Sequence, residues 1–270
     1  MESLRIMVVG AHPDDPELSS GGYALRMHKA GHRVRFVTMT NGSAGHQAMT
    51  TADLAARRKS ETEAVSHLTG FEYTVMPIND GYLEVNCQNR DMLIAELRDF
   101  RPNLIITHRA NDYHPDHRNT GMLVHDASFL VMVPNVCPSA PALDFQPVVA
   151  YASDTFTLPT AFRADVVVAI DEVFDEKVAM VACHESQFYE WLPWLGHFEA
   201  DVPKDAATRL AWLREKQFKR YTDRTDRYRD EILAKYGAER AQCIQACEAF
   251  MISEYGATPD ASDMARLFPF

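Results

Sequence analysis

Two polar clusters in the sequence contain the residue types that bind a divalent metal ion and use it for hydrolysis. The first is Gly10-Ala11-His12-Pro13-Asp14-Asp15-Pro16-Glu17, and the second is Asp112-Tyr113-His114-Pro115-Asp116-His117. Hydrolytic zinc sites take three ligands from His, Asp and Glu and leave one position for water. His12 and Asp15 are three positions apart around a predicted tight turn, so both can reach one ion, and His117 can complete the set.

The other polar residues of the clusters suit hydrolysis by a metal-activated water. Asp14 precedes a predicted ligand, so its side chain is expected to point elsewhere and to accept the proton of the attacking water. His114 lies one helical turn before His117, and Pro115 is typical of a helix start. His114 could therefore face the same crevice and either stabilise a tetrahedral oxyanion or protonate the leaving amine. Asp116 is expected to orient the His114 ring.

Taken singly, each cluster could instead be a helix entry in which an Asp caps free N–H groups. Both clusters, however, follow apolar runs, Ile6–Val9 and Leu104–Thr107. The carboxyl ends of parallel strands share one edge of an open α/β sheet, where ligands bind, and this favours chemistry. Glu17 keeps two interpretations, a partner of a metal ligand or a favourable charge at a helix N-terminus. The remaining histidines are assigned to the surface or to packing: His28, His32, His46, His67, His108, His125, His184 and His197.

Six short apolar runs, rich in β-branched residues, have the pattern of buried strands. They are Leu4–Val9, Val34–Met39, Tyr73–Met76, Leu104–Thr107, Val148–Tyr151 and Val166–Ile170. Helical patterns lie near residues 20–30, 52–68 and 90–100. This alternation predicts an α/β fold, with a doubly wound, mostly parallel Rossmann-like sheet and helices on both faces.

The second half of the chain has a different composition. Val133–Pro147 contains four prolines and predicts a long irregular loop, of the kind that often covers a site. From about Asp205 the pattern is helical and highly charged, which indicates a solvated helical surface. We expect a single domain over residues 1–270, with an α/β core at 1–170 and a mostly helical part at 171–270 packed on it. Trp191, Trp194 and Phe198 either stack on a substrate or make a helix or subunit contact.

The composition of the chain indicates which partners the protein can bind and in which compartment it is found. The formal net charge is −11, and so acidic a surface repels phosphate backbones and anionic membranes, so we expect no nucleic acid partner. No run approaches the roughly 18 uninterrupted apolar residues of a membrane span, and the N-terminus lacks signal-peptide features. The five cysteines are odd in number and form no C-x-x-C pair, which favours free thiols in a reducing cytoplasm. Cys243 and Cys247 are expected to share a helix face.

Several motifs together resemble the LmbE-like, or PIG-L, deacetylase family. They are His12-Pro-Asp-Asp-Pro-Glu17-Leu-Ser-Ser-Gly21-Gly22, Thr40-Asn-Gly42-Ser-Ala-Gly45, Arg58-Lys-Ser-Glu61 leading to Leu68-Thr-Gly70, Asp80-Gly81, His114-Pro-Asp-His117, and Lys177 followed by His184-Glu-Ser186-Gln187. The resemblance covers roughly residues 5–190. The segment Trp191–Phe198 and the charged helices depart from the shorter members of the family.

The resemblance implies site residues and a substrate class. In that family the first His, the second Asp and the last His of these motifs bind zinc, and the first Asp is the general base, in agreement with the assignment above. The family's residues that contact substrate hydroxyls correspond to Arg58 and Asp80. The implied reaction removes an acetyl group from N-acetylglucosamine carried on inositol, malate, a lipid-linked aglycone or a related amide. Fe²⁺ and Co²⁺ would accept the same ligands as Zn²⁺.

Three other functions compete with deacetylation of a small amino-sugar conjugate. An amidase would keep the metal and cleave a larger amide, such as a thiol conjugate or an N-acyl lipopeptide or glycopeptide. A non-catalytic protein with a structural metal would need neither Asp14 nor His114, and structural sites usually fill four positions with Cys and His. A coenzyme-binding oxidoreductase would need the glycine pattern that Thr40–Gly45 lacks. The sequence leaves open the aglycone, the acyl group and whether the chain forms a homo-oligomer.

Overall fold

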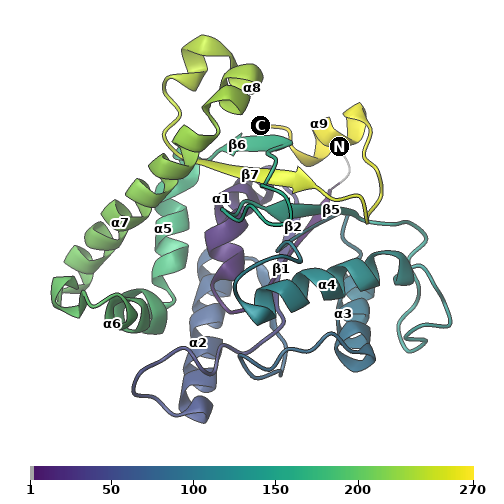
Figure 1. Cartoon of the computed structure of the whole chain (residues 1–270), viewed down its shortest axis with the longest axis horizontal. Helices are drawn as coiled ribbons and strands as arrows, with labels where there is room; N and C mark the ends of the chain where they lie inside the picture. Colours follow the sequence, from purple (N-terminus) through teal and green to yellow (C-terminus); the bar gives the residue numbers. More distant parts are fainter. Residues whose placement is uncertain (1–2) are drawn as a thin grey trace.

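The structure is a computed structural model that describes residues 3–270, and at its centre lies one sheet (Figure 1). The strands are β1 (Arg5–Gly10), β2 (Arg33–Thr38), β3 (Glu72–Val75), β4 (Leu104–Thr107), β5 (Val148–Ala152), β6 (Val166–Ala169) and β7 (Cys247–Ile252). Their order in the seven-stranded sheet is β3-β2-β1-β4-β5-β7-β6. Strands β1 to β5 are parallel, and β7 pairs antiparallel with β5 and β6. The predicted mostly parallel, doubly wound sheet is confirmed.

Helices cover both faces of the sheet, because its strands are apolar on both faces. They are α1 (Asp15–Lys29), α2 (Thr51–Thr69), α3 (Cys87–Phe100), α4 (Pro115–Leu130), α5 (Phe174–Ala182), α6 (Leu192–Leu195), α7 (Ala206–Arg227), α8 (Arg229–Ala241) and α9 (Ala261–Leu267), with short helical turns η1 (Asp171–Val173), η2 (Ser186–Trp191) and η3 (Glu199–Asp201). Ile6 and Val8 of β1 belong to a core with α1, α2 and α5. The alternate residues Met7 and Val9 pack with α3 and α4.

Strand β7 is the element that the sequence did not predict. Each of the six predicted strands lies within one residue of its observed bounds, but the region of Cys247–Ile252 was expected to be helical. Cys247 is therefore in a strand and does not share a helix face with Cys243, so that prediction is wrong. The segment is extended because it fills the space between β5 and β6 and satisfies the backbone groups of both. The part of the chain after residue 170 thus supplies a strand of the sheet as well as helices.

The first polar cluster lies in the connection between β1 and α1, where the strand order reverses between β1 and β4. Ligands bind at such positions in open α/β sheets. Gly10 permits a close approach here, since a Cβ at this residue would lie 2.7 Å from the Cβ of Asp15. Asp14 has a φ of +129°, a conformation that costs a non-glycine residue on the order of 1–3 kcal/mol. The strained turn carries the side chains of the cluster over the end of β1.

The predicted loop at Val133–Pro147 is irregular, but it does not cover a site. The Arg98 guanidinium fastens it by donating hydrogen bonds to the carbonyl oxygens of Leu130, Val131, Val133, Val136, Cys137 and Ala140. Within residues 3–270, no part of this loop lines the cleft described below. It is a fixed connection between α4 and β5. In the same part of the chain, no helix has both the length and the apolar character needed to cross a membrane.

Candidate metal centre and its cleft

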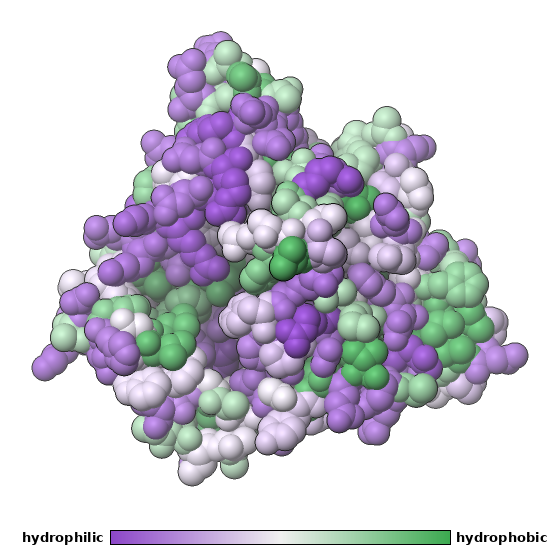
Figure 2. Space-filling model, in the orientation of Figure 1, coloured by the Kyte–Doolittle hydropathy of each residue, from purple (hydrophilic) through white to green (hydrophobic). Residues whose placement is uncertain are grey.

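A cleft of ≈ 1030 Å³ opens at the carboxyl ends of β1 and β4. Its lining includes residues of both polar clusters, which the parallel sheet brings together as predicted. Residues of η2, α6 and α7 form the facing wall, so segments far apart in the sequence enclose it. Figure 2 shows the hollow beside a band of hydrophilic residues that follows α7.

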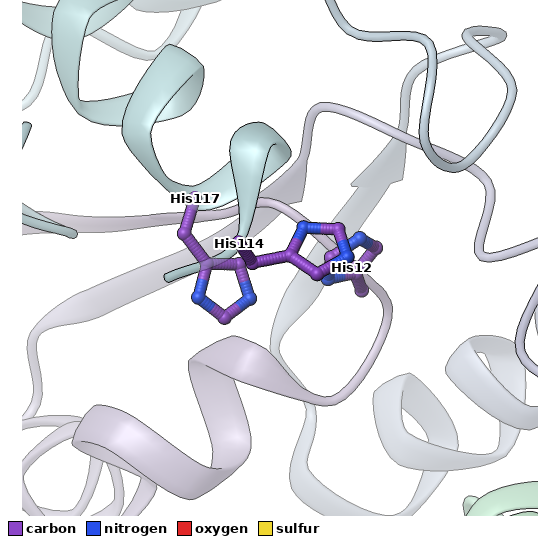
Figure 3. Close-up of side chains that lie close together, drawn as sticks. All are labelled: His12, His114 and His117. Carbon is purple, nitrogen blue, oxygen red and sulfur yellow. The ribbon is translucent and has the colours of Figure 1, made fainter. Parts of the chain in front are cut away.

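The Asp15 carboxylate is the point at which the predicted ligands meet. Its Oδ2 lies 3.5 Å from His12 Nδ1 and 3.6 Å from His117 Nε2. Two ligand atoms of a tetrahedral zinc site, each about 2.1 Å from the ion, are about 3.4 Å apart. Each of the two distances to Asp15 therefore suits a pair of ligands to one divalent ion. Asp15, His108 and His117 form a group whose ligand atoms all lie within 4.8 Å of one another, and His12, His114 and His117 form a second such group. Figure 3 shows the imidazoles of His12, His114 and His117 gathered at the same place.

Both predicted ligand histidines have one ring nitrogen near Asp15 and the other near further carboxylates. His12 Nε2 lies 3.2 Å from Asp116 Oδ2 and 3.1 Å from Asp80 Oδ1. His117 Nδ1 lies 3.2 Å from Asp112 Oδ1. Metal-binding histidines usually donate the second ring N–H to such a partner, which fixes the tautomer and directs the free lone pair at the ion. Asp112, to which the sequence assigned no role, is thus part of the centre.

His108 also belongs to the centre, contrary to its assignment to the surface or to packing. Its Nε2 lies 3.3 Å from Asp15 Oδ2, and its ring stacks on His117 with centroids 4.2 Å apart. Burial and the neighbouring His117 lower the pKa of His108. The available signal was its position directly after the strand Leu104–Thr107, which matches that of His12 after β1.

Asp14 keeps its carboxylate apart from the Asp15 contacts, as expected. Its Oδ2 accepts a hydrogen bond of 3.1 Å from Arg58 Nη2. Burial raises the pKa of Asp14 to about 6, against the opposing effect of Arg58. For Asp15, burial also opposes ionisation, but His117 and His108 hold its pKa well below the usual value. Two adjacent carboxylates thus have different environments, one suited to binding a cation and one to exchanging a proton.

The structure corrects the relation between His114 and Asp116. The Asp116 carboxylate contacts His12, and it accepts hydrogen bonds from the backbone N–H groups of Gly81 (2.6 Å) and Leu83 (3.3 Å). Only the Asp116 backbone N–H reaches His114, donating to Nδ1 at 3.2 Å. The difference arises because His114 precedes the helix as its N-cap, so its side chain caps the first turn. With Nδ1 accepting, the neutral His114 ring carries its proton on Nε2.

Arg58 and Asp80 both line the cleft, although they face different neighbours. Arg58 is buried, and its Nε and Nη1 have no hydrogen-bond partner among the described residues. Asp80 accepts from the Ala44 backbone N–H at 3.3 Å and adjoins His12. The Arg58 Nη2 bonds to Asp14, and its Nη1 lies 3.9 Å from Glu61 Oε2. Nε and Nη1 are thus the guanidinium nitrogens whose hydrogen-bonding capacity is unused.

Glu17 lies behind the cleft in a buried pair with His184. Glu17 Oε1 is 2.8 Å from His184 Nε2, and the Tyr73 hydroxyl donates to Oε2 at 3.3 Å. Among the described residues, Glu17 does not contact a predicted metal ligand. It does lie in the first turn of α1, as expected of a favourable charge at a helix N-terminus. His184 is in the interior, which agrees with its assignment to packing.

The comparison with protein families matches the part of the chain that holds the centre. Residues 7–128 match the PIG-L model, described as GlcNAc-PI de-N-acetylase. Residues 7–128 therefore correspond to a PIG-L family domain. The matched residues include both polar clusters and strands β1 to β4, and they end within α4, so α6 and α7 lie outside them.

Relatives of this chain include named deacetylases. Diacetylchitobiose deacetylase of Thermococcus kodakarensis is 25% identical over 202 residues, covering 71% of this chain and 74% of that protein. A probable N-acetyl-alpha-D-glucosaminyl L-malate deacetylase of Bacillus cereus is 28% identical over 229 residues, covering 80% of this chain and 97% of that protein. The crystal structure of 4-carboxy-2-hydroxymuconate hydratase from Pseudomonas putida matches with a TM-score of 0.73 and 18% identity. The match covers 95% of this chain and 99% of that one. This last likeness shows the fold alone.

Proposed function

We propose that this chain is a metal-dependent hydrolase that removes the acetyl group from an N-acetylated amino sugar. The observation that carries the proposal is the meeting of the His12, Asp15 and His117 donor atoms, with the separate Asp14 carboxylate beside them in one cleft. A structural metal site needs no additional carboxylate of this kind. The relatives named as deacetylases of N-acetylglucosamine-type compounds support the choice of bond.

His12 Nδ1, Asp15 Oδ2 and His117 Nε2 are the atoms that would hold the metal ion. When bound, such an ion would polarise the amide carbonyl and lower the pKa of a water molecule, so that the water can lose a proton and attack the carbonyl carbon. We propose zinc, because two imidazoles and one carboxylate suit a borderline cation, although Fe²⁺ and Co²⁺ accept the same set. Asp112 and Asp116 would keep the two rings in the tautomers that face the ion.

Asp14 is the proposed general base. It takes the proton from the attacking water, and burial raises its pKa to about 6, closer to neutral pH than that of an ordinary Asp. Arg58 holds the carboxylate in place through its hydrogen bond. The strained backbone of Asp14 directs this side chain away from the Asp15 contacts, which lets the two neighbours do separate tasks.

His114 is the proposed donor to the oxyanion or to the departing amine. Its Nδ1 is occupied by the Asp116 backbone N–H, so the proton available for transfer is on Nε2. Burial and the neighbouring His12 lower the pKa of His114. A neutral ring donates a hydrogen bond to developing negative charge and can pass its proton to the nitrogen as the C–N bond breaks.

Arg58 and Asp80 are the proposed contacts to sugar hydroxyls. The Arg58 guanidinium has N–H groups without a hydrogen-bond acceptor and can donate, and the Asp80 carboxylate can accept. Sites with such polar groups reject analogues that lack a hydroxyl, because the groups are then left unpaired. The Trp191 side chain also lines the cleft and offers a flat apolar face to a ring.

The test is acetate release from a series of N-acetylglucosamine glycosides with different aglycones. The metal-loaded chain should release acetate from at least one of them, and a chelator should abolish the release until zinc is returned. No acetate from any glycoside, in a preparation with one metal per chain, would contradict the proposed function.

The second candidate is an amidase for a larger amide, such as a thiol conjugate or an N-acyl glycopeptide. The cleft volume of ≈ 1030 Å³ is at the upper end of the roughly 300–1000 Å³ typical of small-ligand sites, and it leaves room for a large acyl or aglycone group. The same series with N-octanoyl in place of N-acetyl separates the two, since the amidase would prefer the longer acyl chain.

A further inference from the structure

The wall of the cleft opposite the metal centre carries a line of positive charges on one helix. We call it the cationic stripe, and its residues are Lys216, Lys219, Arg220, Arg224 and Arg227 of α7. Spacings of three and four residues place these side chains along one side of the helix. Sequence reasoning assigned this region to solvated surface, whereas these five residues line the cleft.

The arrangement of α7 fixes the direction of the stripe. Leu213, Gln217 and Tyr221 are buried on another side of the helix, where α7 packs against α5 and β7. The Tyr221 hydroxyl also donates to the carbonyl of Leu18 in α1. The helix is thus held by its buried side, and the stripe is presented to the cleft.

The stripe is not neutralised by partners on the protein. Within residues 3–270, none of its members lies within ion-pair distance of a carboxylate, although Asp223 of the same helix also lines the cleft. Other cations of α7 do have partners: Arg209 pairs with Glu185 at 3.9 Å, and Arg214 pairs with Asp175 at 2.7 Å. In a chain with a formal net charge of −11, unpaired cations that line a cleft indicate attraction of an anion.

Two arginines give the stripe its most specific feature. Nη1 of Arg224 is buried and has no hydrogen-bond partner, although its guanidinium lies 4.8 Å from the centre of the Tyr221 ring. The surrounding protein and the nearby Arg224 lower the pKa of Arg220. Like charges held together are unfavourable without an anion, and a fork of guanidinium N–H groups matches carboxylate and phosphate oxygens.

We propose that the cationic stripe binds an anionic group, a carboxylate or a phosphate, on the part of the substrate beyond the reacting amide. The inference rests on the proposed function, since the same cleft holds the candidate metal centre. It adds that the preferred amino-sugar conjugate is an anion. Trp191, Leu192 and Leu195 line the cleft as well, so the charged group would be carried on a moiety with some apolar surface.

Three N-acetylglucosamine glycosides that differ only in their aglycone provide the first test: glycerol, glycerate and glycerol phosphate. The metal-loaded parent should prefer a charged aglycone by about tenfold or more in kcat/KM at low salt, and the preference should shrink as salt is added. The double variant Arg220→Gln/Arg224→Gln should lose this preference while changing kcat/KM for the glycerol glycoside by less than about threefold. The aglycone with the larger loss identifies carboxylate or phosphate as the recognised group.

Arg214→Gln is the control for charge elsewhere on the helix, because it removes one positive charge from α7 at a position that does not line the cleft. It should leave the preference unchanged. An equal loss for all three glycosides in the double variant would overturn the inference, as would no loss at all. Lys216→Gln/Lys219→Gln, at two exposed positions, repeats the test if the arginine variant unfolds.

Calorimetric titration of the metal-loaded chain with glycerol phosphate and with glycerate separates this inference from the proposed function. If no glycoside releases acetate, the proposed function fails, but the stripe can still be tested by binding. The inference is supported if the double variant binds an anion about tenfold or more weakly than the parent, while Arg214→Gln binds it as the parent does. Equal binding of both anions to all three proteins overturns it.

Discussion

The two walls of the cleft come from different parts of the chain and carry different side chains. One wall follows β1 and β4 and gathers imidazoles and carboxylates around Asp15. The other comes from η2, α6 and α7 and carries indole, aliphatic and cationic groups. The family match covers the first wall and ends at residue 128. Groups that need fixed distances are thus placed on strand ends, whereas the groups that we infer to select the substrate are placed on helices whose side chains can change without moving the metal centre.

The largest effect is expected when a predicted metal ligand is removed from the first wall. His117→Ala should lower the metal content of the purified chain and reduce acetate release by about 10³-fold or more, since the lost ion supplies several kcal/mol of stabilisation. Elemental analysis measures the metal, and the exposed His67→Ala is the control. Undiminished metal in His117→Ala would show that the ligand assignment is wrong.

A smaller loss is expected from Asp14→Asn, which keeps the shape of the side chain but not its basicity. The variant should bind a full complement of metal and lose about 10²–10⁴-fold in kcat, the usual contribution of a general base. Metal content and steady-state kinetics must be measured on the same preparation. A metal-free variant would mean that the neighbouring carboxylates share the ligand role, and a loaded, fully active one would remove Asp14 as the base.

Asp112→Asn tests the residue that the structure added to the centre. Loss of the carboxylate that holds His117 Nδ1 should weaken metal binding by about 10–100-fold, as is typical for such partners. Competition with a chelator of known affinity measures this, and excess metal should restore most of the activity. Asp126→Asn, an exposed position on α4, the helix that carries His117, should behave like the parent. Equal affinities in both variants would leave Asp112 without a role.

The smallest effect is expected on the second wall. Trp191→Ala should raise KM for a glycoside with an aromatic aglycone by roughly threefold to tenfold and leave kcat within about twofold, because a stacked ring contributes on the order of 0.5–1.5 kcal/mol. Trp194→Ala is the comparison, since Trp194 stacks on Trp191 at 5.3 Å but does not line the cleft. Equal changes in both variants would indicate a packing role for the pair.

Much of the first wall could be predicted from sequence because local rules determine it. Apolar runs give the strands, and polar residues directly after two neighbouring strands must meet at one edge. The same rule applied to Leu104–Thr107 would have included His108, which was instead assigned with the other histidines to the surface or to packing. The Asp116 contact with His12 could not be predicted, since it depends on how the start of α4 faces the β1 connection.

The second wall and β7 depended on long-range packing that the sequence pattern does not encode. The charges of α7 suggested a solvated surface, and several of these side chains are indeed exposed, but their exposed side faces a cleft. Cys247–Ile252 contains Glu248, which is fully buried and accepts hydrogen bonds from the Gly22 and Tyr23 backbone N–H groups as well as pairing with Lys177. A charged residue in a short segment does not indicate a buried strand until its partners are known.

The position of β7 sets an order on how the molecule can be assembled during synthesis. In the described residues, β6 pairs with no strand other than β7, so it cannot join the sheet until residues 247–252 have left the ribosome. Strands β1 to β4 pair among themselves and can associate much earlier. Closing the long chain between β6 and β7 costs entropy before their contacts repay it. The half of the molecule that holds the metal centre can therefore form while the edge of β5 is still open, and the last strand then completes the sheet.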